Sequence, residues 1–311
     1  MHSAIFIFNR KPGKIISLEP WIVASLIAML ANVAKVLLVK TRCRHVESWT
    51  LLLHARLLPG LVLLGALPFV EHAINDTLAF WGATLAAAVI TIGASLLYME
   101  AIKEGDLSQV TPVQATVPMF MIVCTFILYG EVPNTLSFVF IALIAVSVSF
   151  VLRTSASDKS KDKNRHPSRA LLYSFIAAAL FGVSTVLDRV AINAADNGAL
   201  VFSAYWHLLT LLLLAPLLWF KRQQVSFKAA LNGSVMLYVI AVLTAFITQQ
   251  FAVQLSLELD NGVTFVKTIV MAHIVIASGI GIVYLKERAG SSVWFANIVT
   301  AVSGVGLLWS I

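Results

Sequence analysis

The sequence predicts an all-α membrane protein whose ten transmembrane helices form two inverted five-helix repeats around a central cavity. Three observations lead to this fold class: the composition, the length of the apolar blocks, and a repeat at an offset of 153 residues. Of the 311 residues, 59% are hydrophobic and only 12% are charged, whereas soluble domains carry about 25% charged residues. The mean hydropathy of +0.89 agrees with a chain that lies mostly in lipid.

The apolar blocks have the length of membrane-spanning helices. About 20 residues at 1.5 Å per residue cross a hydrocarbon core of about 30 Å. Inside lipid the backbone must form its hydrogen bonds within its own segment, so each block is predicted to be a helix. No removable targeting segment is expected before the first one. The ten predicted helices cover residues 18–39, 51–70, 77–102, 108–129, 134–152, 170–193, 199–219, 233–257, 262–285 and 292–310.

A basic, serine-containing segment at 153–169 interrupts this pattern and is predicted to be a solvated linker. It divides the chain into an N-terminal repeat, 1–152, and a C-terminal repeat, 170–311. Most lysines and arginines lie in the loops that follow the odd-numbered helices. This distribution places the linker in the cytoplasm and both termini outside.

The formal charge of +7 is explained by topology and by lipid headgroups, so no nucleic-acid partner is expected. We expect a multi-pass protein of the cell (inner) membrane that contacts membrane lipids and a small-molecule metabolite, with a homodimer as one alternative. The two cysteines, Cys43 and Cys124, have neither a disulfide nor a metal-binding pattern. No metal and no cofactor are expected.

The second half of the chain aligns on the first when it is shifted by 153 residues. Three pairs of polar positions inside the spans then coincide, and so does the Val-Thr pair that begins the fourth and the ninth helix. Because polar residues are scarce in these spans, the coincidences indicate a duplication. An odd number of helices per repeat gives the copies opposite topology, with a site near the midplane where they meet. The polar pairs are Lys35 with Asp188, His54 with His207, and Gln114 with Lys267.

In each half, the third helix ends just before a Val-Thr pair opens the fourth, and a glutamate (Glu131 or Glu287) follows the fourth. These features resemble the EamA type of the drug/metabolite transporter superfamily. The resemblance implies that helices one to four and six to nine surround a central cavity, that helices five and ten are peripheral, and that the protein works by alternating access. It also implies cytoplasmic termini, in disagreement with the charge distribution.

Polar and small side chains form one stripe on most of the predicted helices, as expected where helices line a cavity or pack closely. A charge near the centre of a span is disfavoured by about 2.5–3.5 kcal/mol, so Lys35 and Asp188 are predicted to face the cavity, paired or holding the two ends of a zwitterion. The alternatives are that Lys35 and Lys267 extend to the membrane surface and that Asp188 pairs with Arg189. The predicted substrate-binding residues are Asn32, Lys35, Ser95, Tyr98, Gln114, Thr185, Asp188, Thr248, Phe251 and Lys267.

His54, His207 and Asp188 are the candidates for proton coupling, since histidine titrates near neutral pH. The alternative for the two histidines is packing with a local hydrogen bond. Arg56 is expected to face elsewhere and to reach lipid headgroups, and His273 is expected to be a packing residue.

Pro112 and Pro118 are predicted to form a gating bend in the fourth helix, because each removes a backbone donor. Pro118 is expected to free the carbonyl of Gln114 for a ligand. The alternative is a kink that only improves packing.

These residues predict a secondary active transporter that moves a small polar or amphipathic metabolite by alternating access. An amino-acid-like molecule, an organic anion or a zwitterion suits the mixed charge, and coupling to protons is a candidate mechanism. One alternative is a multidrug or quaternary-amine exporter, since Tyr98, Phe181 and Phe251 are aromatic. Another is a flippase or a membrane enzyme that acts on a lipid-linked intermediate, although no nucleophile or metal cluster is recognised and the protein is not expected to be an enzyme.

Overall fold

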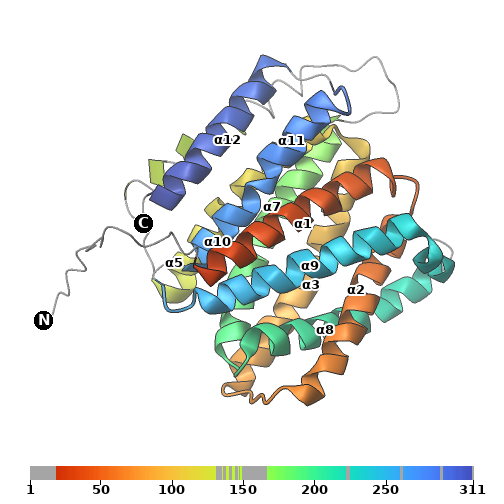
Figure 1. Cartoon of the computed structure of the whole chain (residues 1–311), viewed down its shortest axis with the longest axis vertical. Helices are drawn as coiled ribbons and strands as arrows, with labels where there is room; N and C mark the ends of the chain where they lie inside the picture. Colours follow the sequence, from red (N-terminus) through yellow and green to blue (C-terminus); the bar gives the residue numbers. More distant parts are fainter. Residues whose placement is uncertain are drawn as a thin grey trace, which may run out of the picture.

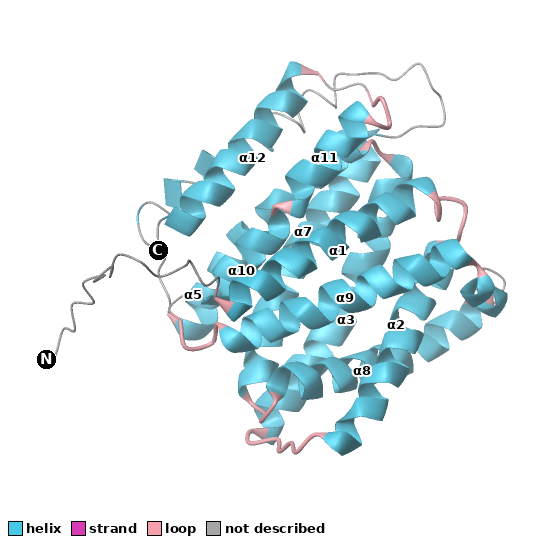
Figure 2. Cartoon of the chain, in the orientation of Figure 1, coloured by secondary structure: helices cyan, strands magenta, loops and turns pink. Residues whose placement is uncertain are grey.

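A computed structural model describes residues 19–130, 167–221, 225–259, 262–287 and 290–309, with single residues between 135 and 148. Within these residues the regular structure is helical (Figure 2), apart from one isolated β-bridge between Ile74 and Ala195. Eight helices are long and apolar enough to cross a membrane. The protein is therefore a helical multi-pass membrane protein.

The ten-helix count is not reached within the described residues. Of the predicted fifth helix, 134–152, only single residues between 135 and 148 are described, and the linker up to residue 166 and Glu131 lie outside the described residues. The predicted tenth helix is present as α12 (Ser291–Trp309), but its described apolar stretch, Val293–Ser303, is shorter than a membrane span. Eight spans are shown, and the count of ten stays a prediction.

The N-terminal half supplies four spans, which begin and end with local capping signals. Asp76 accepts a hydrogen bond from the amide of Ala79 at the start of the third span, and Gly130, with φ +68°, ends the fourth in the left-handed conformation that favours glycine. The spans are α1 (Pro20–Thr41), α2 (Ser48–Ala66) with η1 (Leu67–Phe69), α3 (Thr77–Glu104), and the series α4 (Leu107–Val113), η2 (Gln114–Thr116) and α5 (Val117–Tyr129).

The C-terminal half supplies the other four. Asn232 caps the third of them by accepting a hydrogen bond from the amide of Ser234. The spans are α7 (Pro167–Asn193), α8 (Gly198–Phe220), α9 (Gly233–Leu255), and the series α10 (Gly262–Met271) and α11 (His273–Val283), with η4 (Phe227–Leu231) between α8 and α9.

The fourth span of each half is broken near its middle. In the N-terminal half the turn η2 lies between Pro112 and Pro118, and in the C-terminal half the break falls at Ala272, between α10 and α11. The helix is therefore interrupted where the prolines predicted a bend, and the role of this bend in gating stays a prediction. The prediction of a free carbonyl at Gln114 is wrong, because the tighter 3₁₀ turn lets the amide of Val117 donate a hydrogen bond to that carbonyl.

Helices of the two halves pack against each other in a regular pattern. α1 packs on α9 (Figure 1) and α3 packs on α7, while α2 packs on α8 and α4 packs on α11. α1 and α7 are the first spans of the two halves, and α3 and α9 are the third spans, so the α1–α9 and α3–α7 contacts are equivalent. The α2–α8 and α4–α11 contacts each join a span to its own counterpart in the other half. A twofold relation between the halves produces this pairing.

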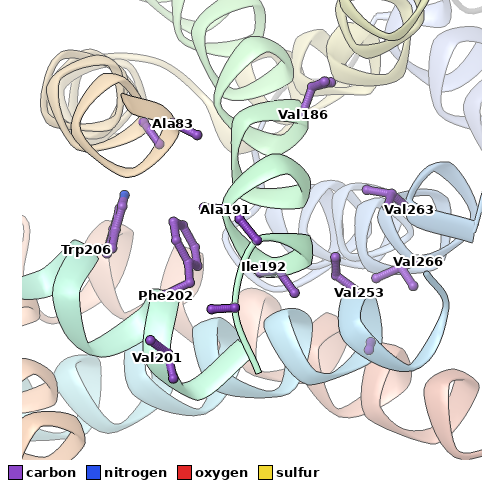
Figure 3. Close-up of a cluster of buried hydrophobic side chains, with 14 of the residues drawn as sticks. Ala83, Val186, Ala191, Ile192, Val201, Phe202, Trp206, Val253, Val263 and Val266 are labelled. Atoms are coloured by element: carbon purple, nitrogen blue, oxygen red, sulfur yellow. The ribbon is translucent and has the colours of Figure 1, made fainter. Parts of the chain in front are cut away.

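Two hydrophobic clusters mark the two ends of the bundle. The first contains Trp206 and Phe202 of α8 with side chains of α3, α7, α9 and α10 (Figure 3). The second contains the C-terminal ends of α1 and α3 and the N-terminal end of α2. α1 runs from the first cluster to the second, whereas α7 runs from Ala170 in the second to Ala191 in the first. The first spans of the two halves therefore run in opposite directions.

Candidate functional site

A cavity of about 150 Å³ is lined by residues of all eight membrane-spanning segments. α12 contributes none of its described residues to this lining and packs on the outside, against α10, α11 and α4 (Figure 1). This agrees with the central cavity and the peripheral tenth helix that the resemblance implied.

Eight of the ten predicted substrate-binding residues lie in this one cavity. They come from five different spans and are far apart in the sequence, so the fold brings them together. They are Asn32, Lys35, Ser95, Tyr98, Gln114, Thr185, Asp188 and Lys267. That they bind a substrate stays a prediction.

Thr248 and Phe251 are not part of the lining, and their placement there was wrong. Phe251 is 42% exposed on the outer side of α9. Thr248 donates its hydroxyl to the carbonyl of Thr244, at 2.6 Å. The cavity face of α9 instead carries Tyr238, Val242, Ala245, Phe246 and Gln249.

The error in α9 comes from the alignment offset. The lining residues of α3 occur 147 positions before those of α9, not 153. A shift of six residues rotates a helix by about 240°, which moves a cavity residue to the outer face. The α3 residues in question are Thr91, Ser95, Tyr98, Met99 and Ile102.

Lys35 and Asp188 both face the cavity but form no ion pair with each other within the described residues. The Nζ of Lys35 donates to Oδ1 of Asn32 at 2.5 Å, and Asn32 in turn donates to the carbonyl of Ala28. One carboxylate oxygen of Asp188 accepts from the amide of Gln250 at 3.1 Å, while its other oxygen is buried with no partner in the described part of the chain. Both side chains therefore keep groups that a ligand can use.

Lys267 also lines the cavity, since its side chain does not extend to the membrane surface and is 7% exposed. It forms no hydrogen bond with a described residue, and its nearest opposite charge is Asp188. Gln114, its predicted counterpart, lines the same cavity and donates to the carbonyl of Ser174 at 2.7 Å. The amide of Gln114 thus connects η2 to α7.

Arg56 is the main cavity residue that sequence reasoning missed. It was expected to reach lipid headgroups, but it is 6% exposed and lines the cavity. Its guanidinium carbon lies 4.4 Å from the centre of the Trp206 ring, and Nη2 donates to Ser95 at 3.1 Å. Arg56 is the ninth residue of α2, about 12 Å along the helix from its start. That depth is the signal that could have identified it.

His273 is a second residue whose expected role was incomplete. Its Nδ1 bonds the carbonyl of Val270 at 2.7 Å, as a packing residue would. The same ring also lines the cavity.

The cavity therefore gathers more positive than negative charge. Lys35, Arg56 and Lys267 face a single carboxylate, that of Asp188. Lys35 lies close enough to the other two cations for mutual repulsion. Buried like charges without counter-charges are unfavourable, so this arrangement favours an anionic group in the cavity.

His54 and His207 lie outside the cavity lining. In both residues Nδ1 bonds the backbone carbonyl four positions earlier, at 2.8 Å. The ring of His207 packs edge-on against Trp206 and Phe246. This geometry favours the packing interpretation, and their role in proton coupling stays a prediction.

Glu287 connects the two halves at one end of the bundle. Its two carboxylate oxygens accept hydrogen bonds from the amides of Leu107 and Ser108, at 2.9 and 2.8 Å. These amides begin α4, where a negative charge is stabilising. Lys40 lies 4.0 Å from the same carboxylate and donates to the carbonyls of Ile102 and Gly105. Glu287 thus caps a helix of the other half.

No group of three or more metal-ligand side chains occurs among the residues that the structure describes.

Comparisons with known proteins give a family match over part of the chain and a shared fold. The model of the EamA-like transporter family matches residues 19–153. Among 28 matching chains of solved structures, one crystal structure covers 92% of this chain and 98% of its own, with a TM-score of 0.59 and 16% identity. That likeness extends the shared fold over both halves. No curated protein matches the chain.

Proposed function

Because residues 19–153 match the model of the EamA-like transporter family, we propose that this membrane protein is a secondary active transporter of small organic anions or zwitterions. The observation that carries this proposal is the cavity in which Lys35, Arg56 and Lys267 face the single carboxylate of Asp188. Transport by alternating access and a location in the cell (inner) membrane are parts of the same proposal.

Two inverted repeats provide the architecture for alternating access. The cross-packing of α1 on α9 and of α7 on α3 supports a twofold relation between the halves. The opposite directions of α1 and α7 support the inversion. The broken fourth spans lie next to the cavity, so a bend there could change access, with Pro112 and Pro118 as the proposed gating residues.

The substrate is proposed to carry a carboxylate or phosphate group, which the cations of the cavity attract. An amino-acid-like zwitterion is included, because Asp188 has one oxygen without a partner among the described residues and could accept a hydrogen bond from an ammonium group. A cavity of about 150 Å³ suits a small metabolite.

A quaternary-amine exporter is the second candidate, since Tyr98, Phe181 and Phe246 also line the cavity and aromatic faces attract cations. Trp206, the largest aromatic group present, is already covered by Arg56 on its ring face. Three protein cations would repel a cationic substrate, so this function is less well supported.

The experiment is uptake by proteoliposomes that contain the purified protein. Labelled dicarboxylates, phosphate esters, amino acids and choline are compared, with and without a pH gradient, and protein-free liposomes serve as the control. We expect anions or zwitterions to accumulate and choline to stay at the background level. Uptake of choline without uptake of any anion or zwitterion would contradict the proposal.

A further inference from the structure

We infer that Arg56 is the residue that binds the anionic group of the transported molecule, and that it does so through two parallel N–H groups of its guanidinium. This inference rests on the proposed function and deepens it by assigning a recognition residue and a ligand geometry. The ligand class is an oxyanion with at least two accessible oxygens, namely a carboxylate, a phosphate or a sulfonate.

Arg56 keeps most of its N–H groups free within the described residues. A guanidinium has five. Within the described residues, one of them is used, by the hydrogen bond from Nη2 to Ser95 at 3.1 Å. Nε is buried without a partner in the same part of the chain. Since Nη2 has two hydrogens, one complete edge of the guanidinium keeps two parallel N–H groups, which is the geometry that oxyanions accept.

The guanidinium of Arg56 has a fixed orientation. Its central carbon lies 4.4 Å from the centre of the Trp206 ring, so the ring face of Trp206 supports it. Trp206 is itself stacked on Phe246, with ring centres 4.5 Å apart and an interplanar angle of 19°. The hydrogen bond from Nη2 to Ser95 restricts the rotation of the guanidinium that the ring face leaves free. A group that is already ordered loses little entropy when it binds a ligand.

Arg56 lacks a counter-charge among the described residues. It is 6% exposed and forms no ion pair with a residue in the described ranges. The groups that interact with it electrostatically include the cation of Lys35 and the phenol of Tyr238. A buried cation in this setting is stabilised by an anion that enters the cavity.

Arg56 differs in this respect from the two cavity lysines. Lys35 and Lys267 are point charges, which attract any anion regardless of its shape. Only the planar guanidinium distinguishes an oxyanion with two aligned oxygens from a spherical anion of the same charge. Arg56 is therefore the residue that determines specificity for oxyanions, while the lysines raise the overall attraction.

The test measures the melting temperature of the purified full-length protein against the concentration of defined probes. The probes are succinate, inorganic phosphate and methanesulfonate, with chloride and neutral succinamide for comparison, all at one ionic strength. Each probe is applied to the parent, to Arg56→Gln, to Arg56→Lys and to Arg189→Gln. Arg189 is the matched control because its guanidinium also lies over an aromatic ring, that of Tyr129 at 4.6 Å, but does not line the cavity.

We expect at least one oxyanion to stabilise the parent and the Arg189→Gln variant with the same half-saturating concentration. In Arg56→Gln that concentration rises at least about tenfold, because charge-assisted hydrogen bonds are lost. In Arg56→Lys it rises at least about fivefold, because the charge stays but the two-point contact does not. Should the glutamine variant fail to fold in gel filtration, the lysine variant decides.

Parent-like half-saturation in Arg56→Gln would overturn the inference and leave anion transport intact. Parent-like half-saturation in Arg56→Lys would overturn the two-point contact. Stabilisation of the parent by none of the oxyanions, together with no oxyanion uptake in proteoliposomes, would overturn both the inference and the proposed function.

Discussion

Two sets of polar side chains are buried in the helical bundle, and they differ in whether they line the cavity. His54 and His207 each bond a carbonyl of their own helix and lie outside the cavity. Arg56 is two residues after His54 on α2, yet it lines the cavity and keeps N–H groups without partners in the described part of the chain. A separation of two residues turns a helix by about 200°, so the two side chains belong to opposite faces.

Burial and repetition therefore do not identify a functional residue. The two histidines are the better match between the halves, but neither lines the cavity, although Nε2 of His207 is also buried without a partner in the described part of the chain. Arg56, Asp188 and Lys267 are buried as well, line the cavity and have polar atoms without partners among the described residues. The following predictions test that distinction, from the largest expected effect on transport to the smallest.

Lys267→Gln is expected to reduce anion uptake by at least about tenfold. The variant removes a buried charge whose hydrogen bond to an anion contributes roughly 1.5–3 kcal/mol. The measurement is initial uptake into proteoliposomes of the anion that the parent transports best. Lys228→Gln, on the exposed surface of η4, is the matched control and should behave as the parent does. If both variants transport alike, Lys267 does not act on the substrate.

Asp188→Asn is expected to transport with a several-fold lower response to a pH gradient. An amide can still accept the hydrogen bond that Gln250 donates, so the fold should stay intact, but an amide cannot bind or release a proton. Uptake is measured with the inside and outside pH equal and then different. Asp196→Asn, which changes an exposed aspartate bonded to Asn75, is the control. An unchanged pH response in Asp188→Asn would exclude Asp188 from coupling.

Glu287→Gln is expected to weaken the contact between the halves by about 1–2 kcal/mol, because the amides of Leu107 and Ser108 lose a charged acceptor at a helix N-terminus. The readouts are a lower melting temperature and faster labelling of a cysteine placed at Ile102, in the cavity wall next to this contact. Glu258→Gln, on an exposed loop, is the control. Slower labelling would show that the contact of Glu287 with α4 does not limit access to the cavity from this end of the bundle.

His54→Asn and His207→Gln are expected to have the smallest effect on transport, within about twofold of the parent. Their pH response should be unchanged, because neither ring lines the cavity. A lower melting temperature is expected for His207→Gln, since the ring fills a closely packed site beside Gly60. Loss of the pH response in either variant would remove the distinction between the two sets of side chains.

The sequence was sufficient for the membrane class, the eight described spans and most of the cavity, for a geometric reason. The lining residues of α1 and α7 match at an offset of 149 residues. The alignment used 153, and an error of four residues turns a helix by only about 40°, so Lys35 and Asp188 were still predicted on the correct face. In α9 the error was six residues, which was enough to exchange Val242 for Thr248 and Ala245 for Phe251.

The other failures concern properties that a helical pattern does not contain. The pattern says which residues share a face, but not how deeply a long side chain is enclosed, and so Arg56 was assigned to headgroups. It identifies a missing donor at Pro118, but not the 3₁₀ turn that lets Val117 satisfy the carbonyl of Gln114. It also contains nothing on contacts between halves, such as Glu287 at the start of α4.

The most direct test of the shared cavity compares single cysteines at positions 249 and 251, two residues apart on α9. Cys124 is replaced by serine, and so is Cys43, which is buried and whose thiol pKa is raised by that burial. We predict that Gln249→Cys reacts with a water-soluble anionic thiol reagent and is protected by the transported anion, whereas Phe251→Cys stays unreactive in the lipid-facing surface. Reaction at position 251 but not at 249, or equal reaction without protection, would contradict the account.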